Sequence, residues 1–88
     1  MLVEARTLAY GSLIVRPVNE KVRKEWAADT LQWGGRTDGE LFLTKSEADE
    51  FIEECVPKRQ RRDLRAGRTV RFRMDAWTLR HMIGYGVD

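Results

Sequence analysis

The chain of 88 residues has little of the side-chain chemistry that enzymes and metal sites use. It contains one cysteine and one histidine, so no intrachain disulfide can form, and no ligand spacing indicates a zinc site. A single free thiol is typical of a reducing compartment. Cys55 lies in an apolar stripe, which disfavours the activated thiolate that a Cys55–His81 nucleophile and base would need. We therefore expect no metal, no cofactor and no enzymatic activity.

Long apolar runs are also missing. The run Leu13–Val15 is too short for the core of an export signal, and Glu4 and Arg6 interrupt the apolar residues before it. No segment approaches the ~20 apolar residues of a membrane span. The glycine-rich residues 34–39 lack the Gly-Lys-Ser/Thr ending of a phosphate-binding loop and are expected to form a turn. These absences predict a soluble, cytoplasmic protein that does not contact a membrane.

Charge is abundant and unevenly distributed. The formal net charge is only +2, but eight of the 16 lysines and arginines fall in residues 58–73 beside one acid, Asp63. Residues 1–57 carry seven basic and 11 acidic side chains, a net of −4. Residues 58–88 carry nine basic and three acidic side chains, a net of +6, so the two parts sum to the stated +2. The sequence therefore describes a dipolar molecule.

Apolar periodicity predicts three strands. Residues 12–16 and 40–43 are short apolar runs bounded by glycine, proline or capping residues. Residues 69–74 alternate apolar and polar side chains, which is the two-residue period of a half-buried strand. Residues 2–10 are ambiguous between an edge strand and an extended arm.

Helix signals follow the strands. Asn19 is a good N-cap for a helix over residues 20–33. Thr44 and Glu47 match a capping box, and the apolar stripe after them predicts the clearest helix of the chain, with Ala48, Phe51, Ile52, Cys55 and Val56 as its members. A short helical turn is expected over residues 58–66. Asp75 can cap a last helix over residues 76–83, for which a hairpin is the alternative.

These elements predict one small domain over residues 1–88 with an α+β fold, or a small α/β fold. We expect one sheet of three or four strands with two or three helices, in the order (β)βαβαβα, and the pattern leaves parallel and antiparallel pairing open. Gly11, Gly39 and Gly67 recur 28 residues apart. Ordinary strand and helix lengths account for that spacing without an internal repeat.

The arginine-rich segment is the main candidate site. On a strand, Arg71 and Arg73 would share a face that points away from the core. On a short helix, Arg59, Arg62 and Arg65 would line one side. Arginine suits phosphate because its planar fork donates two parallel hydrogen bonds and keeps its charge. The candidate residues are Lys58, Arg59, Arg61, Arg62, Arg65, Arg68, Arg71 and Arg73, with Trp33 and Arg36 beside them.

An acidic helix face precedes that segment. Its members are Glu47, Asp49, Glu50, Glu53 and Glu54. These acids could neutralise the arginines that follow, or could imitate nucleic-acid phosphates in the groove of a basic partner. Among the tryptophans, Trp26 is expected in the core, whereas Trp33, at a helix end, could stack on a base.

We interpret the chain as a small non-enzymatic binding protein whose segment 58–73 engages nucleic acid or a nucleoprotein. If five phosphates were neutralised, affinity would fall roughly 500-fold between about 50 and 200 mM salt. The alternative is an inhibitor or adaptor of the kind that phages and mobile elements encode. Such a protein would bind a host protein through its segregated acidic and basic faces.

Overall fold

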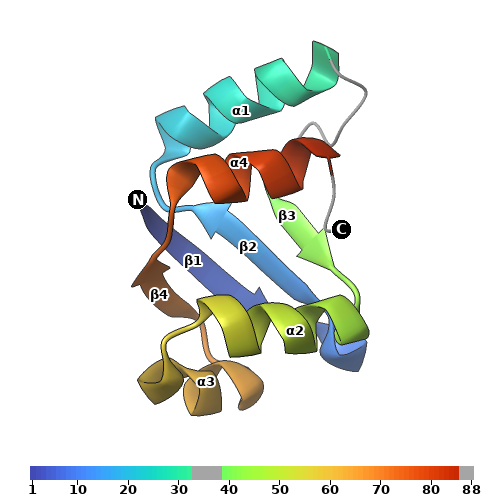
Figure 1. The fold of residues 1–88 in the computed structure, drawn as a ribbon, viewed down its shortest axis with the longest axis vertical. Coiled ribbons are helices and arrows are strands. Elements are labelled where there is room, and N and C mark those ends of the chain that lie inside the picture. The colour runs from blue at the N-terminus through green and yellow to red at the C-terminus, as the bar shows by residue number, and fades with distance from the viewer. Residues whose placement is uncertain (33–38, 86–88) are drawn as a thin grey trace.

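A computed structural model describes residues 1–32 and 39–85 of the chain (Figure 1). Within these ranges the strands are β1 (Leu2–Thr7), β2 (Leu13–Pro17), β3 (Leu41–Leu43) and β4 (Val70–Arg73). The helices are α1 (Glu20–Gln32), α2 (Lys45–Cys55), α3 (Lys58–Arg65) and α4 (Ala76–Tyr85), and a short 3₁₀ turn, η1 (Ala9–Gly11), joins β1 to β2. The α+β class is confirmed. The fourth helix exceeds the expected number because residues 58–65 form two full helical turns.

The strands make one antiparallel sheet in the order β3-β2-β1-β4. Residues 2–7 were expected at an edge or in an arm, and this expectation is wrong because β1 pairs with β2 on one side and with β4 on the other. Val3 and Ala5 are fully buried. Glu4 and Arg6, which weaken the apolar pattern in the sequence, face the opposite side of the sheet. The segment is thus an interior strand with one apolar face and one charged face.

The core lies between one face of the sheet and the helices. In Figure 1, α2 and α4 lie across the sheet, α1 lies beside α4, and α3 lies next to α2 at the far end. The inward residues of all four strands are buried, and the helices meet them with the following buried side chains: Ala48, Phe51, Ile52, Leu64, Leu79 and Ile83. The predicted stripe of α2 is therefore confirmed as a core face, with Cys55 half-buried at its end.

Side-chain caps fix where the helices begin. Asn19 Oδ1 accepts the Val22 amide at 3.2 Å, and the Thr44–Glu47 capping box is present. Asp75 Oδ2 accepts the Thr78 amide at 2.9 Å and so starts α4, which shows that the hairpin alternative for residues 76–83 is wrong. Each cap satisfies an amide that would otherwise lack a partner in the first turn.

Gly39 brings the chain close to α1 immediately before β3. Its φ is +69°, in the left-handed region, and a Cβ atom on it would collide with the backbone carbonyl of Arg23. Only glycine combines that conformation with so close an approach. The chain before β3 therefore approaches α1 more closely than any side chain at position 39 would allow.

We predict that Gly39→Ala lowers the free energy of unfolding by roughly 2–3 kcal/mol, since the left-handed conformation and the overlap with Arg23 both oppose a Cβ atom. Gly67→Ala is the matched control, because φ at Gly67 is +89° but no atom lies within 4 Å of the added Cβ. Urea denaturation of both variants measures the difference. Equal losses in the two would show that the contact with Arg23 does not matter.

Candidate functional site: the cationic edge of the sheet

The arginine-rich segment folds into α3 and the edge strand β4, and the two lie side by side. Gln60 Nε2 donates to the backbone oxygen of Arg71 at 2.6 Å, which joins the middle of α3 to the middle of β4. Leu64 is fully buried, and its backbone oxygen accepts the hydroxyl of Thr7 on β1 at 2.8 Å. The expected short helix and the expected strand therefore form one continuous edge of the molecule.

Two of the arginines on α3 neutralise α2. Arg61 closes the carboxyl end of that helix, with Nε donating to the Val56 oxygen at 3.0 Å and a terminal nitrogen donating to the Glu53 backbone oxygen at 2.8 Å. Arg65 lies 2.9 Å from the Glu53 carboxylate and 3.6 Å from that of Asp49. Asp49 and Glu53 are four residues apart on the helix, where like charges repel each other, and a cation that both acids contact relieves this repulsion.

Two further arginines have one acidic partner each. Arg68 pairs with Asp63 at 2.9 Å, and Arg71 pairs with Glu4 at 3.2 Å. Both arginine side chains remain largely exposed to solvent, at 73% and 59%. Because the Arg68–Asp63 pair is exposed on both sides and contributes little to stability, an anionic ligand could compete for the guanidinium of Arg68. The Glu4 carboxylate is only 18% exposed, so the pair that it makes with Arg71 is not of this kind.

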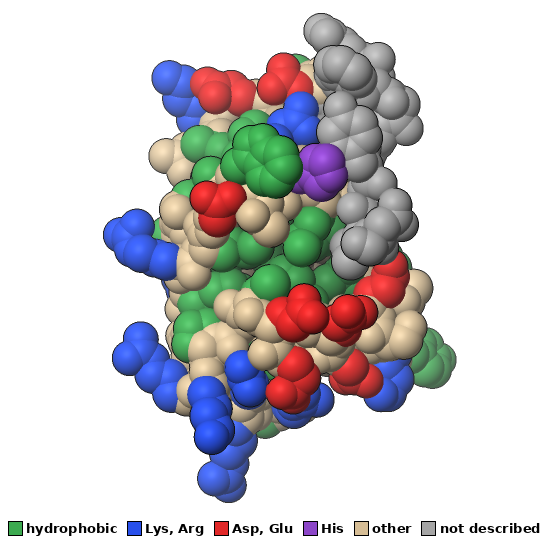
Figure 2. All heavy atoms as spheres, viewed as in Figure 1, with side chains coloured by type: hydrophobic (Ala, Val, Ile, Leu, Met, Phe, Trp, Pro, Cys, Tyr) green, Lys and Arg blue, Asp and Glu red, His purple; other side chains and the backbone are tan. Residues whose placement is uncertain are grey.

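The remaining four basic side chains of the segment are exposed and have no ion pair within residues 1–32 and 39–85. They are Lys58, Arg59 and Arg62 on α3 and Arg73 on β4, and we call them the cationic rim. On the helix, Arg62 is three residues from Arg59 and four from Lys58, so the three share one face. In Figure 2, Lys and Arg side chains project from the side of β4 and α3, whereas Asp and Glu gather over α2.

The acidic face of α2 also contains both engaged and exposed side chains. Glu47 is engaged in the capping box, and Asp49 also contacts Lys45 at 3.0 Å. Glu53 is held by Arg61 and Arg65. Glu50 and Glu54 are exposed and make no ion pair within the described ranges. Only part of the face that could imitate phosphates is therefore available to a partner.

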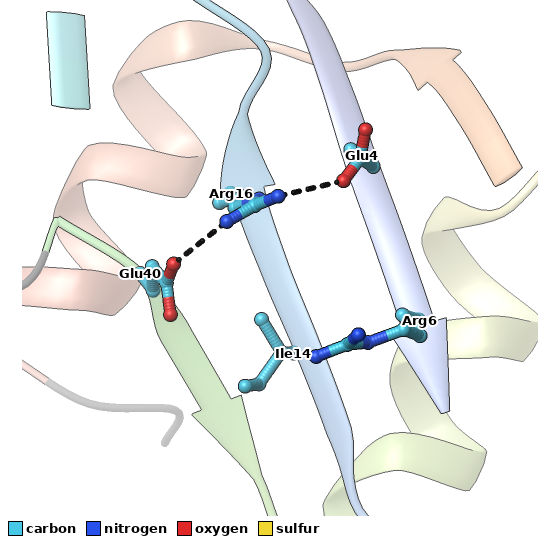
Figure 3. A pocket seen from close by; sticks show the side chains of 5 residues that line it. All are labelled: Glu4, Arg6, Ile14, Arg16 and Glu40. Carbon is cyan, nitrogen blue, oxygen red and sulfur yellow. Dashed lines mark hydrogen bonds and ion pairs between the residues drawn. The ribbon is translucent and has the colours of Figure 1, made fainter. Parts of the chain in front are cut away.

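A row of alternating charges crosses the face of the sheet that the helices leave open. Arg16 on β2 lies between Glu4 on β1, at 3.0 Å, and Glu40 at the start of β3, at 3.3 Å (Figure 3). Arg71 on β4 contacts the same Glu4 carboxylate. We call Glu40, Arg16, Glu4 and Arg71, in that order across the four strands, the charge row. Sequence reasoning missed its first three members because they become neighbours only through strand register.

The charge row shifts the pKa values of Glu4 and Arg16. Burial alone would raise the pKa of Glu4, but the hydrogen bonds and charges of Arg16 and Arg71 outweigh it and hold that pKa below its ordinary value. The hydrogen bond that Arg16 donates to Glu4 is the main reason that the pKa of Arg16 is raised. Together with Arg6 and Ile14, three members of the row line a shallow hollow on the open face (Figure 3).

Cys55 and the potential metal ligands are the other candidate groups. Burial, and to a lesser degree the charge of Glu54, raises the pKa of the Cys55 thiol, so it is not activated. No cluster of three or more His, Cys, Asp or Glu side chains within the described ranges could hold a metal ion. In the same part of the chain, every helix is too short or too polar to cross a membrane.

The tryptophans have different environments. Trp26 is half-buried and packs against the core. Trp77 is 71% exposed and stacks on His81, with ring centroids 5.0 Å apart. Trp33 and Arg36, the two candidates added to the arginine-rich segment, lie outside the described residues. The stacking prediction for Trp33 therefore stays a prediction.

Comparisons of the chain with protein-family models, with curated proteins and with solved structures found no match.

Acidification should destabilise the fold through the charge row. The folded-state pKa of Glu4 lies below its unfolded value near 4.5, so its ion pairs contribute full stability above that pH and lose it as the pH falls through the lower, folded value. The shifts of Glu47, Asp49 and Asp75 have the same sign. We expect the melting temperature to fall below about pH 4.5, and to fall less steeply in Glu4→Gln. Identical pH profiles for Glu4→Gln and the parent protein would contradict this role.

Proposed function

We propose that the protein is a non-enzymatic binding protein that contacts the phosphates of nucleic acid, free or in a nucleoprotein, through the cationic rim. One observation carries the proposal. The four side chains of the rim are exposed cations without an acidic partner in the described part of the chain, although carboxylates elsewhere in the same molecule neutralise their neighbours.

The rim has the chemistry that phosphate recognition requires. Three of its four members are arginines, which can each present two donors to one phosphate group. The helical members are fixed by the buried Leu64, and Arg73 is fixed by the pairing of β4 with β1. Arg68, between α3 and β4 in the chain, can move from the exposed Asp63 carboxylate to a phosphate at low cost.

The rim supplies charge without a stacking surface. The large apolar side chains that are exposed in the described residues are Leu2, Tyr10, Phe42 and Trp77, and none belongs to α3 or β4. Contacts to phosphate fix orientation on a nucleic acid but carry no base information. We therefore expect binding that depends little on base sequence and strongly on salt.

The salt dependence provides a quantitative test. Four neutralised phosphates give a slope near −3.6 in a plot of log affinity against log salt, which is a loss of roughly 150-fold between about 50 and 200 mM. This loss of affinity is smaller than the one expected for five contacts, because four of the eight basic side chains in residues 58–73 already form ion pairs with acids of the same chain. Fluorescence anisotropy with a labelled duplex at several salt concentrations measures the slope.

The double substitution Arg59→Ala/Arg62→Ala should reduce the magnitude of that slope by about two units. It should also weaken binding to duplexes of unrelated base sequence by the same factor. Lys21→Ala/Lys24→Ala is the charge-matched control, since it removes two exposed cations from α1 at a distance from the rim. Both variants should retain the parent's circular dichroism spectrum. Equal losses in the two variants would attribute binding to net charge and would exclude the rim as the site.

The second candidate function is a protein-directed inhibitor or adaptor of the phage or mobile-element type. Glu50 and Glu54 on the outer face of α2 favour it, because they are exposed, have no ion pair in the described ranges and could contact a basic groove of a host protein. Pull-down from nuclease-treated lysate separates the two functions. A partner that survives nuclease and is lost with Glu50→Lys/Glu54→Lys would support this candidate. Loss of every partner on nuclease treatment would support the first.

A further inference from the structure

The proposed function uses only Arg73 from the open face of the sheet. Side chains that alternate with the buried ones point toward it from all four strands, and none is fully buried. No described helix packs on it (Figure 1). The charge row crosses its middle, in the strand order β3-β2-β1-β4.

The order of charges in that row is negative, positive, negative, positive. Read in reverse, the same row is positive, negative, positive, negative. A face with this pattern is complementary to itself when a second copy is turned so that its strand order runs the other way. Isologous dimers require this kind of self-complementarity.

We propose that the open face binds a second copy of the chain, related by a two-fold axis that runs parallel to the strands between the two sheets. In this arrangement Glu40 faces Arg71 of the other copy, and Glu4 faces Arg16 of the other copy. A two-fold axis perpendicular to the strands would place each charge opposite its own equivalent. The charge row therefore selects one orientation.

Apolar side chains lie on both sides of the row in positions that suit the same orientation. Leu2 on β1 is 39% exposed, and its backbone oxygen accepts the amide of Val18 next to it at 3.2 Å. The two-fold axis places Leu2 of one copy over Val18 of the other. On the opposite side, Ile14 and Phe42 are register partners, and Ile14 would meet the aliphatic part of Arg6.

The cost of burying the charges is reduced because the monomer has already removed much of their hydration. The side chains of Glu4 and Glu40 are only 18% and 20% exposed, and Arg16 is 39% exposed. A dimer adds one further opposite charge to each while displacing little further water. This is the physical reason that a charged sheet face can pack on its own copy.

The face is small, so the dimer should be weak. Four strands at ~4.8 Å spacing and five residues at ~3.4 Å give a projected area on the order of 300 Å² per copy. An interface of this size lies below the ~1,200 Å² of buried surface in stable complexes. We expect a dissociation constant on the order of 0.1–1 mM and rapid exchange.

Sedimentation velocity on the unaltered protein tests the association. Between about 0.02 and 1 mM, the average mass should rise from 10.3 kDa toward twice that value. A constant monomer mass up to about 1 mM would overturn the proposal without the use of any variant. The result does not depend on the proposed function, because no member of the cationic rim is needed for the contact.

A mixing experiment tests the geometry. Glu40→Arg alone places a guanidinium opposite Arg71 of the other copy, and Arg71→Glu alone places a carboxylate opposite Glu40, so each variant should be monomeric. Mixed in equal amounts, the two should form a heterodimer in which both contacts again join opposite charges. Because residues 40 and 71 lie on opposite edges of the sheet, three strand spacings apart, no contact within one chain can produce this rescue.

Recovery of dimer in the mixture, at the concentration where each variant alone is monomeric, supports the proposed orientation. Absence of recovery with both variants folded by circular dichroism overturns it. If either variant is unfolded, Glu40→Gln, Arg71→Gln and their double variant replace them. The double variant should then weaken association no more than either single variant, and additive weakening would contradict a direct contact.

Discussion

The burial of one side of β1 determines most of this structure. Val3 and Ala5 are completely removed from solvent, and the strand is paired on both edges, so its position and register are fixed. Because successive side chains of a strand alternate between faces, that register also determines where Glu4 and Arg6 point. The location of Glu4 then brings Arg16 and Arg71 together from the two neighbouring strands. A purely hydrophobic constraint on one face thus organises the charges on the other.

The junction between α2 and α3 determines which cations of the basic segment are available. Arg61 donates to two backbone oxygens at the end of α2, and this role leaves it only 27% exposed. Arg65 bridges two acids on the same helix. The buried Leu64 fixes the rotation of α3, so Arg59 and Arg62 must project from its other side. The division between structural and available arginines therefore follows from packing.

Local patterns in the sequence predicted much of the fold. Asn19, the Thr44–Glu47 box and Asp75 were recognised as caps because capping depends on residues three apart in the chain. The central place of β1 and the charge row were not predicted, since both depend on which distant segments pair and in what register. Charge counting located the basic segment, but only the fold distinguishes Arg65, which is paired, from Arg62, which has no ion pair among the described residues.

The contact between Gln60 and the Arg71 backbone oxygen bears on how the molecule avoids aggregation. An unprotected edge strand exposes backbone groups that can pair with another chain and begin an ordered aggregate. Here a side-chain amide already occupies one of those oxygens on β4, and the neighbouring positive charges repel an identical edge. Natural sheets use lysine and other edge charges in the same way. The arginines on this edge therefore help to prevent folded chains from pairing edge to edge, whatever ligand they bind.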